Sequence, residues 1–158
     1  MIKPYELKDP VKFKEKLLET TDLLGLPIDK GILRSIIILN SIGFPTTGSC
    51  EGHQENYSSK PYIDIVFQTL PEENIEDCKK LFFETLFQDL ADFYGNRKVP
   101  HSRKISFESP IFSQFEISIR INSNLKIYGE GRAEKLKEHY LELTEFCEFL
   151  NKKYQLNY

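Results

Sequence analysis

The sequence predicts a single α+β domain, residues 1–158, with a mainly antiparallel sheet of about four strands packed by helices. A chain of 158 residues is long enough to bury one core. Its segments alternate between helical and strand periodicity in the order α-α-β-β-α-β-β-β-α. The connections before the later strands are short, which favours antiparallel neighbours, and no repeat or linker divides the chain.

Two helices are expected in the first third of the chain. Asp9 supplies a capping carboxylate and Pro10 fits the first turn, so a helix starts here and ends near Gly25. A second helix is expected from about Asp29 to Ser41 and ends before Gly43. This second helix has little polar face, which predicts burial on more than one side.

The later elements follow from alternation and from apolar stripes. We interpret Phe44 to Thr47 as a short strand, and "YIDIVF" alternates Ile63 and Ile65 with Tyr62 and Asp64, which predicts a second strand. The remaining expected elements are a helix opened by Pro71 and closed by Gly95, strands in "KISF" and "FEISIRI", a short strand from Leu125 to Tyr128, and a last helix from about Arg132 to Tyr154.

Composition limits the classes of function. A net charge of -3 excludes a domain-wide basic surface for nucleic acid or anionic lipid. The N-terminal residues lack the apolar region of a signal peptide, and "SIIIL" is too short to span a bilayer. Three cysteines, an odd number, are expected to be reduced thiols: Cys50, Cys78 and Cys147. We therefore expect a cytoplasmic protein that does not bind membranes.

The stretch "TTGSCEGHQ", from Thr46 to Gln54, concentrates reactive side chains between the second helix and the "YIDIVF" strand. We interpret it as a ligand-binding loop in which Gly48 and Gly52 let a ligand approach the backbone. Thr46, Thr47 and Ser49 supply hydroxyls, and exposed amides of such a turn bind phosphate or carboxylate groups. The alternative is a polar turn whose hydroxyls satisfy its own backbone.

The same stretch contains a candidate catalytic pair, Cys50 and His53. A cysteine nucleophile needs a base within hydrogen-bond reach and usually a third group that orients the base, here Glu51 or Asp64. These two residues also supply only two of the three or four ligands that a metal site requires, so no metal site is predicted.

Two further groups of cations are candidates for ligand contacts. Arg120 lies on the polar side of "FEISIRI", where it either binds a ligand carboxylate or phosphate or pairs with Glu116 or a neighbouring strand. The segment "GNRKVPHSRK" either contacts RNA or nucleotide phosphates or forms a solvated loop. Its cations are Arg97, Lys98, Arg103 and Lys104, with His101 between them.

The motif residues carry a resemblance that covers roughly the first third of the chain. They are Leu39, Asn40, Thr46, Thr47, Ser49, Cys50, Gly52 and His53. This pattern resembles the wybutosine-synthesising methyltransferase family, whose hallmark is a Thr-Thr-Ser-Ser-Cys-Ser-Gly-Arg loop. The resemblance implies an α+β fold, S-adenosylmethionine as methyl donor, tRNA as substrate and a ligand-facing loop. Gly48 and Glu51 replace serines of that hallmark, His53 replaces its arginine, and the chain has no Trp for the family's second motif.

Two hypotheses of function follow. In the first, the Thr47–His53 loop binds a nucleotide-like or RNA-base ligand, as in an RNA-modification-type transferase. In the second, the protein is a non-catalytic regulatory module that binds a ligand or partner. A concave pocket around Arg120, Asp64 and the loop favours the first, and a flat surface favours the second. We expect Ser49, Cys50 and His53 to line an accessible cleft and Cys50 to react with thiol reagents.

Overall fold

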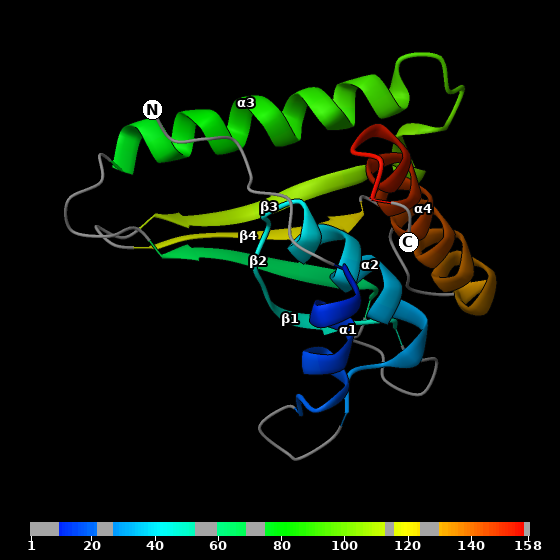
Figure 1. The fold of residues 1–158 in the computed structure, drawn as a ribbon. Coiled ribbons are helices and arrows are strands. Elements are labelled where there is room, and N and C mark those ends of the chain that lie inside the picture. The colour runs from blue at the N-terminus through cyan, green and yellow to red at the C-terminus, as the bar shows by residue number, and fades with distance from the viewer. Residues whose placement is uncertain are drawn as a thin grey trace.

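The computed structural model describes residues 10–21, 27–52, 60–68, 75–112, 116–123 and 130–156. In that part of the chain, the elements occur in the order α1 (Pro10–Leu18), α2 (Lys30–Ser41), β1 (Thr46–Cys50), β2 (Tyr62–Gln68), α3 (Ile75–Tyr94), a 3-10 turn (His101–Arg103), β3 (Ile105–Phe112), β4 (Glu116–Ser123) and α4 (Arg132–Lys153). The predicted α+β class is confirmed (Figure 1). The first helix ends at Leu18, earlier than predicted, and the predicted strand from Leu125 to Tyr128 lies outside the described residues.

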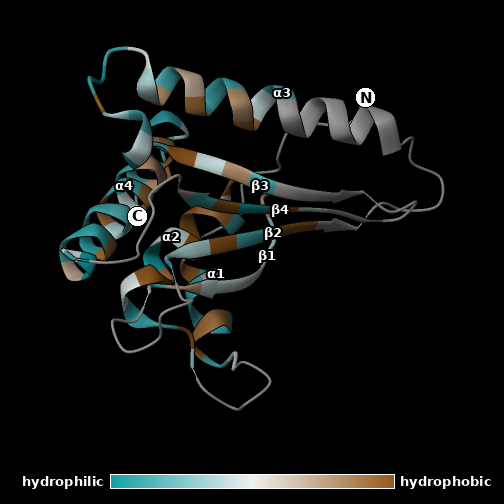
Figure 2. Ribbon diagram, turned by 180° about the vertical axis from the view of Figure 1, so that it is seen from behind, coloured by the Kyte–Doolittle hydropathy of each residue, from teal (hydrophilic) through white to brown (hydrophobic). Residues whose placement is uncertain are grey.

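The four strands form one antiparallel sheet in the order β1-β2-β4-β3. Hydrophobic and hydrophilic residues alternate along much of β2, as the colours of Figure 2 show. Ile63 and Ile65 pair with Ile121 and Ile119 of β4, and all four side chains are buried. Because successive strand residues point to opposite faces, the residues between them lie on the other face of the sheet.

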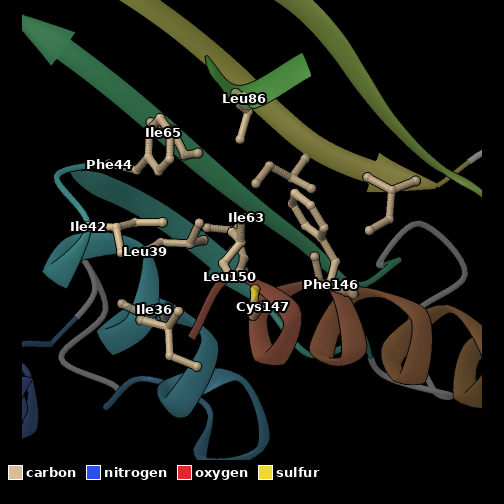
Figure 3. Packing of buried hydrophobic residues seen from close by; sticks show 14 of the residues in the cluster. Ile36, Leu39, Ile42, Phe44, Ile63, Ile65, Leu86, Phe146, Cys147 and Leu150 are labelled. Carbon is tan, nitrogen blue, oxygen red and sulfur yellow. The ribbon is translucent and has the colours of Figure 1, made fainter. Parts of the chain in front are cut away.

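The face of the sheet that carries these isoleucines is covered by helices, and we call it the helix-covered face. Helices α2, α3 and α4 all contribute to the same hydrophobic cluster as the isoleucines, part of which Figure 3 shows. The helical members of that cluster are Ile32, Ile36, Ile38, Leu39, Leu86, Phe93, Leu143, Phe146, Cys147 and Leu150. The prediction that the second helix is buried on more than one side is confirmed, because Ile36, Ile37 and Ile38 are all buried.

Ion pairs tie α4 to the other helices around this cluster. Arg34 of α2 donates hydrogen bonds to both carboxylate oxygens of Glu148. At the C-terminal end of α4, Lys153 Nζ lies 2.6 Å from Oδ1 of the buried Asp89 on α3, and the Tyr154 hydroxyl donates to Oδ2 of the same residue at 2.8 Å. Helix α4 therefore holds α2 and α3 together over one face of the sheet.

Candidate functional site

The stretch predicted as a loop begins as an edge strand. Thr46 to Cys50 form β1, which pairs antiparallel with β2. The strand predicted from Phe44 to Thr47 is therefore found at Thr46 and Thr47 but begins later and extends to Cys50, and the loop prediction is wrong for Gly48, Ser49 and Cys50. The irregularity in the pairing between Thr46 and Gly48 leaves Thr47 exposed. Hydroxyl and glycine residues are typical of turns, but β2 supplies a partner strand, and this tertiary pairing overrides the local preference. Of the loop, Glu51 and Gly52 are described, and His53 lies outside the described residues.

The beginning of β1 is attached to the end of α2 by Asn40. The Asn40 side-chain amide donates to Thr46 Oγ1 at 2.8 Å, and the Thr46 N–H donates back to Asn40 Oδ1 at 3.3 Å. The hydroxyl of Thr46 therefore satisfies a neighbouring side chain inside the scaffold. Ser49 pairs with Ile63, which places it on the helix-covered face of the sheet.

The residue after β1 caps the beginning of α2. Glu51 Oε2 accepts the Gly31 N–H at 2.8 Å, and the Glu51 N–H donates to Asp29 Oδ2 at 3.1 Å. Glu51 thus bonds to both Asp29 and Gly31 at the beginning of α2, although it lies 20 positions after Gly31. A Cβ on Gly31 would collide with Glu51 Oε2, so glycine permits this close approach. The Tyr140 hydroxyl donates to the Gly31 carbonyl at 2.8 Å and fixes α4 to the same point.

The expectation that Cys50 is accessible is wrong, because its side chain is buried at 9% exposure. Burial raises the pKa of the Cys50 thiol, and the carboxylates of Asp29 and Glu51 raise it further, while the hydrogen bond from the Gly52 N–H lowers it. The thiol is therefore protonated at neutral pH. Catalysis by Cys50 with His53 as base stays a prediction, and the burial of the thiol counts against it.

The other face of the sheet, which we call the polar face, brings together several predicted site residues. Asp64 pairs with Gly48 on one side and Arg120 on the other, and Arg120 pairs in turn with Glu108 of β3. Cys50 pairs with Tyr62, the strand neighbour of Asp64 on this face. The described polar face therefore consists of Gly48, Cys50, Tyr62, Asp64, Val66, Ser106, Glu108, Ser118, Arg120 and Asn122.

Arg120 contacts two neighbouring side chains of the polar face, Asp64 and Tyr62. Its Nε donates to Asp64 Oδ1 at 2.7 Å and its Nη2 donates to Asp64 Oδ2 at 2.8 Å, a bidentate pair. Its guanidinium carbon lies 4.0 Å from the centre of the Tyr62 ring. The hydrogen bonds to Asp64 raise the pKa of Arg120, and the Arg120 side chain is still 44% exposed. The ion pair of Arg120 was predicted to form with Glu116 or with a neighbouring strand. In the structure its partner is Asp64 of the neighbouring strand β2.

Glu108 of β3 and Asn122 of β4 are two polar residues beside Arg120 that were not among the predicted site residues. The Asn122 side-chain amide donates to Glu108 Oε2 at 3.0 Å, and Glu108 is exposed. The alternation within "KISFES" predicts that Glu108 lies on the opposite face of the sheet from Ile105 and Phe107. The pairing of Glu108 with Arg120 depends on the register of β3 against β4, which that alternation leaves open.

The cations of the basic segment contact helices α3 and α4. Arg97 Nη2 lies 3.2 Å from Glu142 Oε2 and 2.7 Å from Glu145 Oε2, and its guanidinium carbon lies 4.1 Å from the centre of the Phe93 ring. Arg103 Nε lies 3.6 Å from Glu138 Oε2. These contacts fix the α3–β3 connection to α4. The predicted contact with RNA stays a prediction, with Lys98 exposed in the same segment.

Lys104 completes this basic segment. Its Nζ lies 5.1 Å from the centre of the Tyr94 ring, and the Tyr94 hydroxyl accepts the Ile105 N–H at 2.8 Å. Within the described ranges, no three His, Cys, Asp or Glu side chains are grouped so that they could hold a metal ion. Helices with the length and apolar content of a membrane span are likewise not found in the part of the chain that the structure describes.

No family model, curated protein or solved structure matches this chain. The resemblance to the wybutosine-synthesising methyltransferase family rests on the motif residues alone and stays a prediction. The polar face is the part of the described structure where predicted site residues lie together.

Proposed function

We propose that the protein is a non-catalytic module that binds a nucleotide-like ligand through its base, on the polar face. The observation that carries this proposal is the Arg120 guanidinium, which Asp64 holds over the Tyr62 ring, with its carbon 4.0 Å from the ring centre. Arginine planes and aromatic rings are the groups on which proteins stack the bases of nucleotides. The bidentate pair fixes the orientation of the plane before the ligand arrives, so less freedom is lost on binding.

Gly48 supports this proposal from the neighbouring strand. The position that a Cβ would occupy on Gly48 is 3.0 Å from Asp64 Oδ2. A larger side chain at residue 48 would therefore displace or cover the Asp64 carboxylate, whereas glycine leaves the carboxylate open toward β1. The predicted binding role of Gly48, Asp64 and Arg120 is retained here, and Thr46, Ser49 and Glu51 are assigned to the scaffold by their contacts.

A thermal-shift screen tests this proposal. The compounds are the common nucleosides, their 5'-monophosphates and S-adenosylmethionine, the last because of the motif resemblance. A ligand that binds only the folded protein raises the melting temperature by mass action. We expect at least one base-bearing compound to do so at about millimolar concentration, which corresponds to weak but specific binding.

Variants locate the site in the same assay. Arg120→Ala should abolish the shift, and Lys98→Ala, which removes an exposed cation elsewhere, should leave it unchanged. A screen in which every base-bearing compound fails to raise the melting temperature contradicts the proposed function. A shift that persists in Arg120→Ala shows that the compound binds somewhere other than the polar face.

A further inference from the structure

The side-on edge of Arg120, formed by Nε and Nη2, is already occupied by Asp64. Nε and Nη2, which together form the fork that would receive a phosphate or carboxylate, both donate to Asp64 at 2.7 and 2.8 Å. An anionic ligand that used this edge would have to displace Asp64, and the other three N–H groups, on Nη1 and Nη2, are not used by the pair. The guanidinium therefore does not offer its side-on fork to a phosphate.

The charge around Arg120 also disfavours an anion. In the sheet register, Arg120 lies between Asp64 on β2 and Glu108 on β3. Two carboxylates thus flank one guanidinium, which leaves one net negative charge on these three residues. Both carboxylates act on Arg120 through their charges, and both raise its pKa. A phosphate approaching the polar face would meet repulsion from the same two groups.

The flat surface of Arg120 offers a second way to bind a ligand. The guanidinium carbon lies over the Tyr62 ring, 4.0 Å from its centre. The side chain is 44% exposed, so a planar group can stack on it from solvent. Stacking on an arginine plane needs a ring and does not need a charge.

The groups beside this plane are hydrogen-bond acceptors. Ionised carboxylates have about four lone-pair sites and no donor. Arg120 uses one site on each oxygen of Asp64, and Asn122 uses one on Oε2 of Glu108. The polar face therefore matches a ring that carries N–H donors at its edge. Cytosine, adenine and guanine carry an exocyclic amine, whereas the edge of uracil has two carbonyl groups and one N–H.

We propose that the ligand of the polar face is a free, uncharged nucleoside whose base carries an exocyclic amine, stacked on Arg120 with its amine toward Asp64 or Glu108. This inference rests on the proposed function and names its ligand class. A nucleic-acid strand fits less well, because the described cations Arg97 and Arg103 lie in ion pairs with α4. The polar face itself offers no net positive charge for a phosphate backbone.

Calorimetric titration of matched nucleosides tests the proposal. The pairs are cytidine with uridine, adenosine with inosine, and guanosine with inosine, and in each pair the second compound lacks the amine of the first. We expect at least one amine-bearing nucleoside to bind about tenfold or more tightly than its counterpart, because the counterpart leaves a carboxylate acceptor without a donor. Its 5'-monophosphate should bind no more tightly than the nucleoside.

Two variants and a control complete the test. Glu108→Gln and Asp64→Asn each replace an acceptor, and one of them should reduce the preference for the amine severalfold or more. Glu134→Gln, which removes an exposed carboxylate on α4, should leave the preference unchanged. An increase in ionic strength from about 50 mM to about 300 mM should change the affinity for the nucleoside less than twofold, since the ligand is uncharged.

The inference and the proposed function fail in different ways. If the deaminated nucleosides bind as well as their partners, or if monophosphates bind tighter with a strong dependence on salt, the ligand class is wrong while binding on the polar face stands. If no base-bearing compound binds, the proposed function is wrong as well. If only a protein or an RNA strand binds the polar face, the nucleoside is not its ligand.

Discussion

The two faces of the sheet are built from alternate residues of the same strands and have different physical roles. On the helix-covered face, Ile63, Ile65, Ile119 and Ile121 are almost completely buried, and burial of this kind is the main source of folding free energy. On the polar face, Asp64 and Arg120 form a well-aligned but partly exposed ion pair. Exposed pairs contribute at most about 1 kcal/mol to stability. The ion pair on the polar face therefore contributes little to the free energy of folding. For this reason we propose that its role is in ligand binding.

The same division runs through β1 and the residue that follows it. Thr46 and Glu51 bind the two ends of α2, and Ser49 is on the helix-covered face. Gly48 and Cys50 are on the polar face, where Gly48 leaves Asp64 open. A motif that looks uniformly reactive in the sequence is thus divided between residues that bind the ends of α2 and residues that lie at the proposed site.

Substitutions at two adjacent residues of β2 should differ most in their effect on the free energy of unfolding. Ile65→Ala removes a fully buried side chain from the core and should reduce the free energy of unfolding by about 2 to 5 kcal/mol. Asp64→Ala, one residue earlier, should reduce it by about 1 kcal/mol or less, because the pair with Arg120 is partly exposed. Urea denaturation measures both. Equal losses would show that the polar face is part of the stabilising core.

Acid should destabilise the protein because it protonates His139, a buried residue of α4. Burial, together with the charge of Lys60, lowers the pKa of His139 from the ordinary 6.5 to about 4. Between these values the unfolded chain binds a proton that the folded protein does not bind, so stability falls as the pH drops from about 6.5 to about 4. The loss should amount to about 2 to 3 kcal/mol, since His139 is only 2% exposed.

The variant His139→Gln should flatten the dependence of unfolding free energy on pH in this window. The lowered pKa of Glu148, which comes mainly from its hydrogen bond with Arg34, should leave a further decline at lower pH in both proteins. An unchanged slope between pH 6.5 and 4 in His139→Gln would show that another group controls the acid response.

The capping role of Glu51 predicts a smaller effect. Glu51→Ala removes the acceptor of the Gly31 N–H and should cost about 1 kcal/mol, as loss of a helix cap usually does. Glu51→Gln retains an acceptor oxygen and should cost about half of this or less, through the lost charge at the helix N-terminus. Thermal melts of the two variants measure the difference. If neither variant lowers the melting temperature but both weaken ligand binding, Glu51 belongs to the proposed site and not to the scaffold.

The sequence predicts the fold well because periodicity depends on which side of an element is buried. Residues 62–68 alternate because one face of the sheet is buried. Residues 36–39 of α2 are all apolar because this helix is buried on more than one side. The site was harder to predict because it depends on pairing between distant residues. Glu51 caps a helix that starts about 20 positions earlier, and Glu108 meets Arg120 only through the β3–β4 register.

Thiol reactivity gives the smallest effect. Site-resolved labelling followed by mass spectrometry should show Cys50 reacting at least about tenfold more slowly in the native protein than in urea, because burial raises its pKa and blocks access. Cys147 should react more slowly still, since complete burial raises its pKa to about 12. Native labelling of Cys50 at the rate of the unfolded chain would restore it as an accessible nucleophile.

The most direct test of the division between the two faces is a titration of the ¹⁵N-labelled protein with cytidine, adenosine and guanosine, followed by backbone amide shifts. The account predicts that the largest shifts fall on residues 48–50, 62–64, 106–108 and 118–122, which form the polar face and its strand neighbours. Amides of α2 and α4 should change little. Shifts concentrated on the helices, or no shift with any of the three nucleosides, would contradict the claim that the polar face is the binding site.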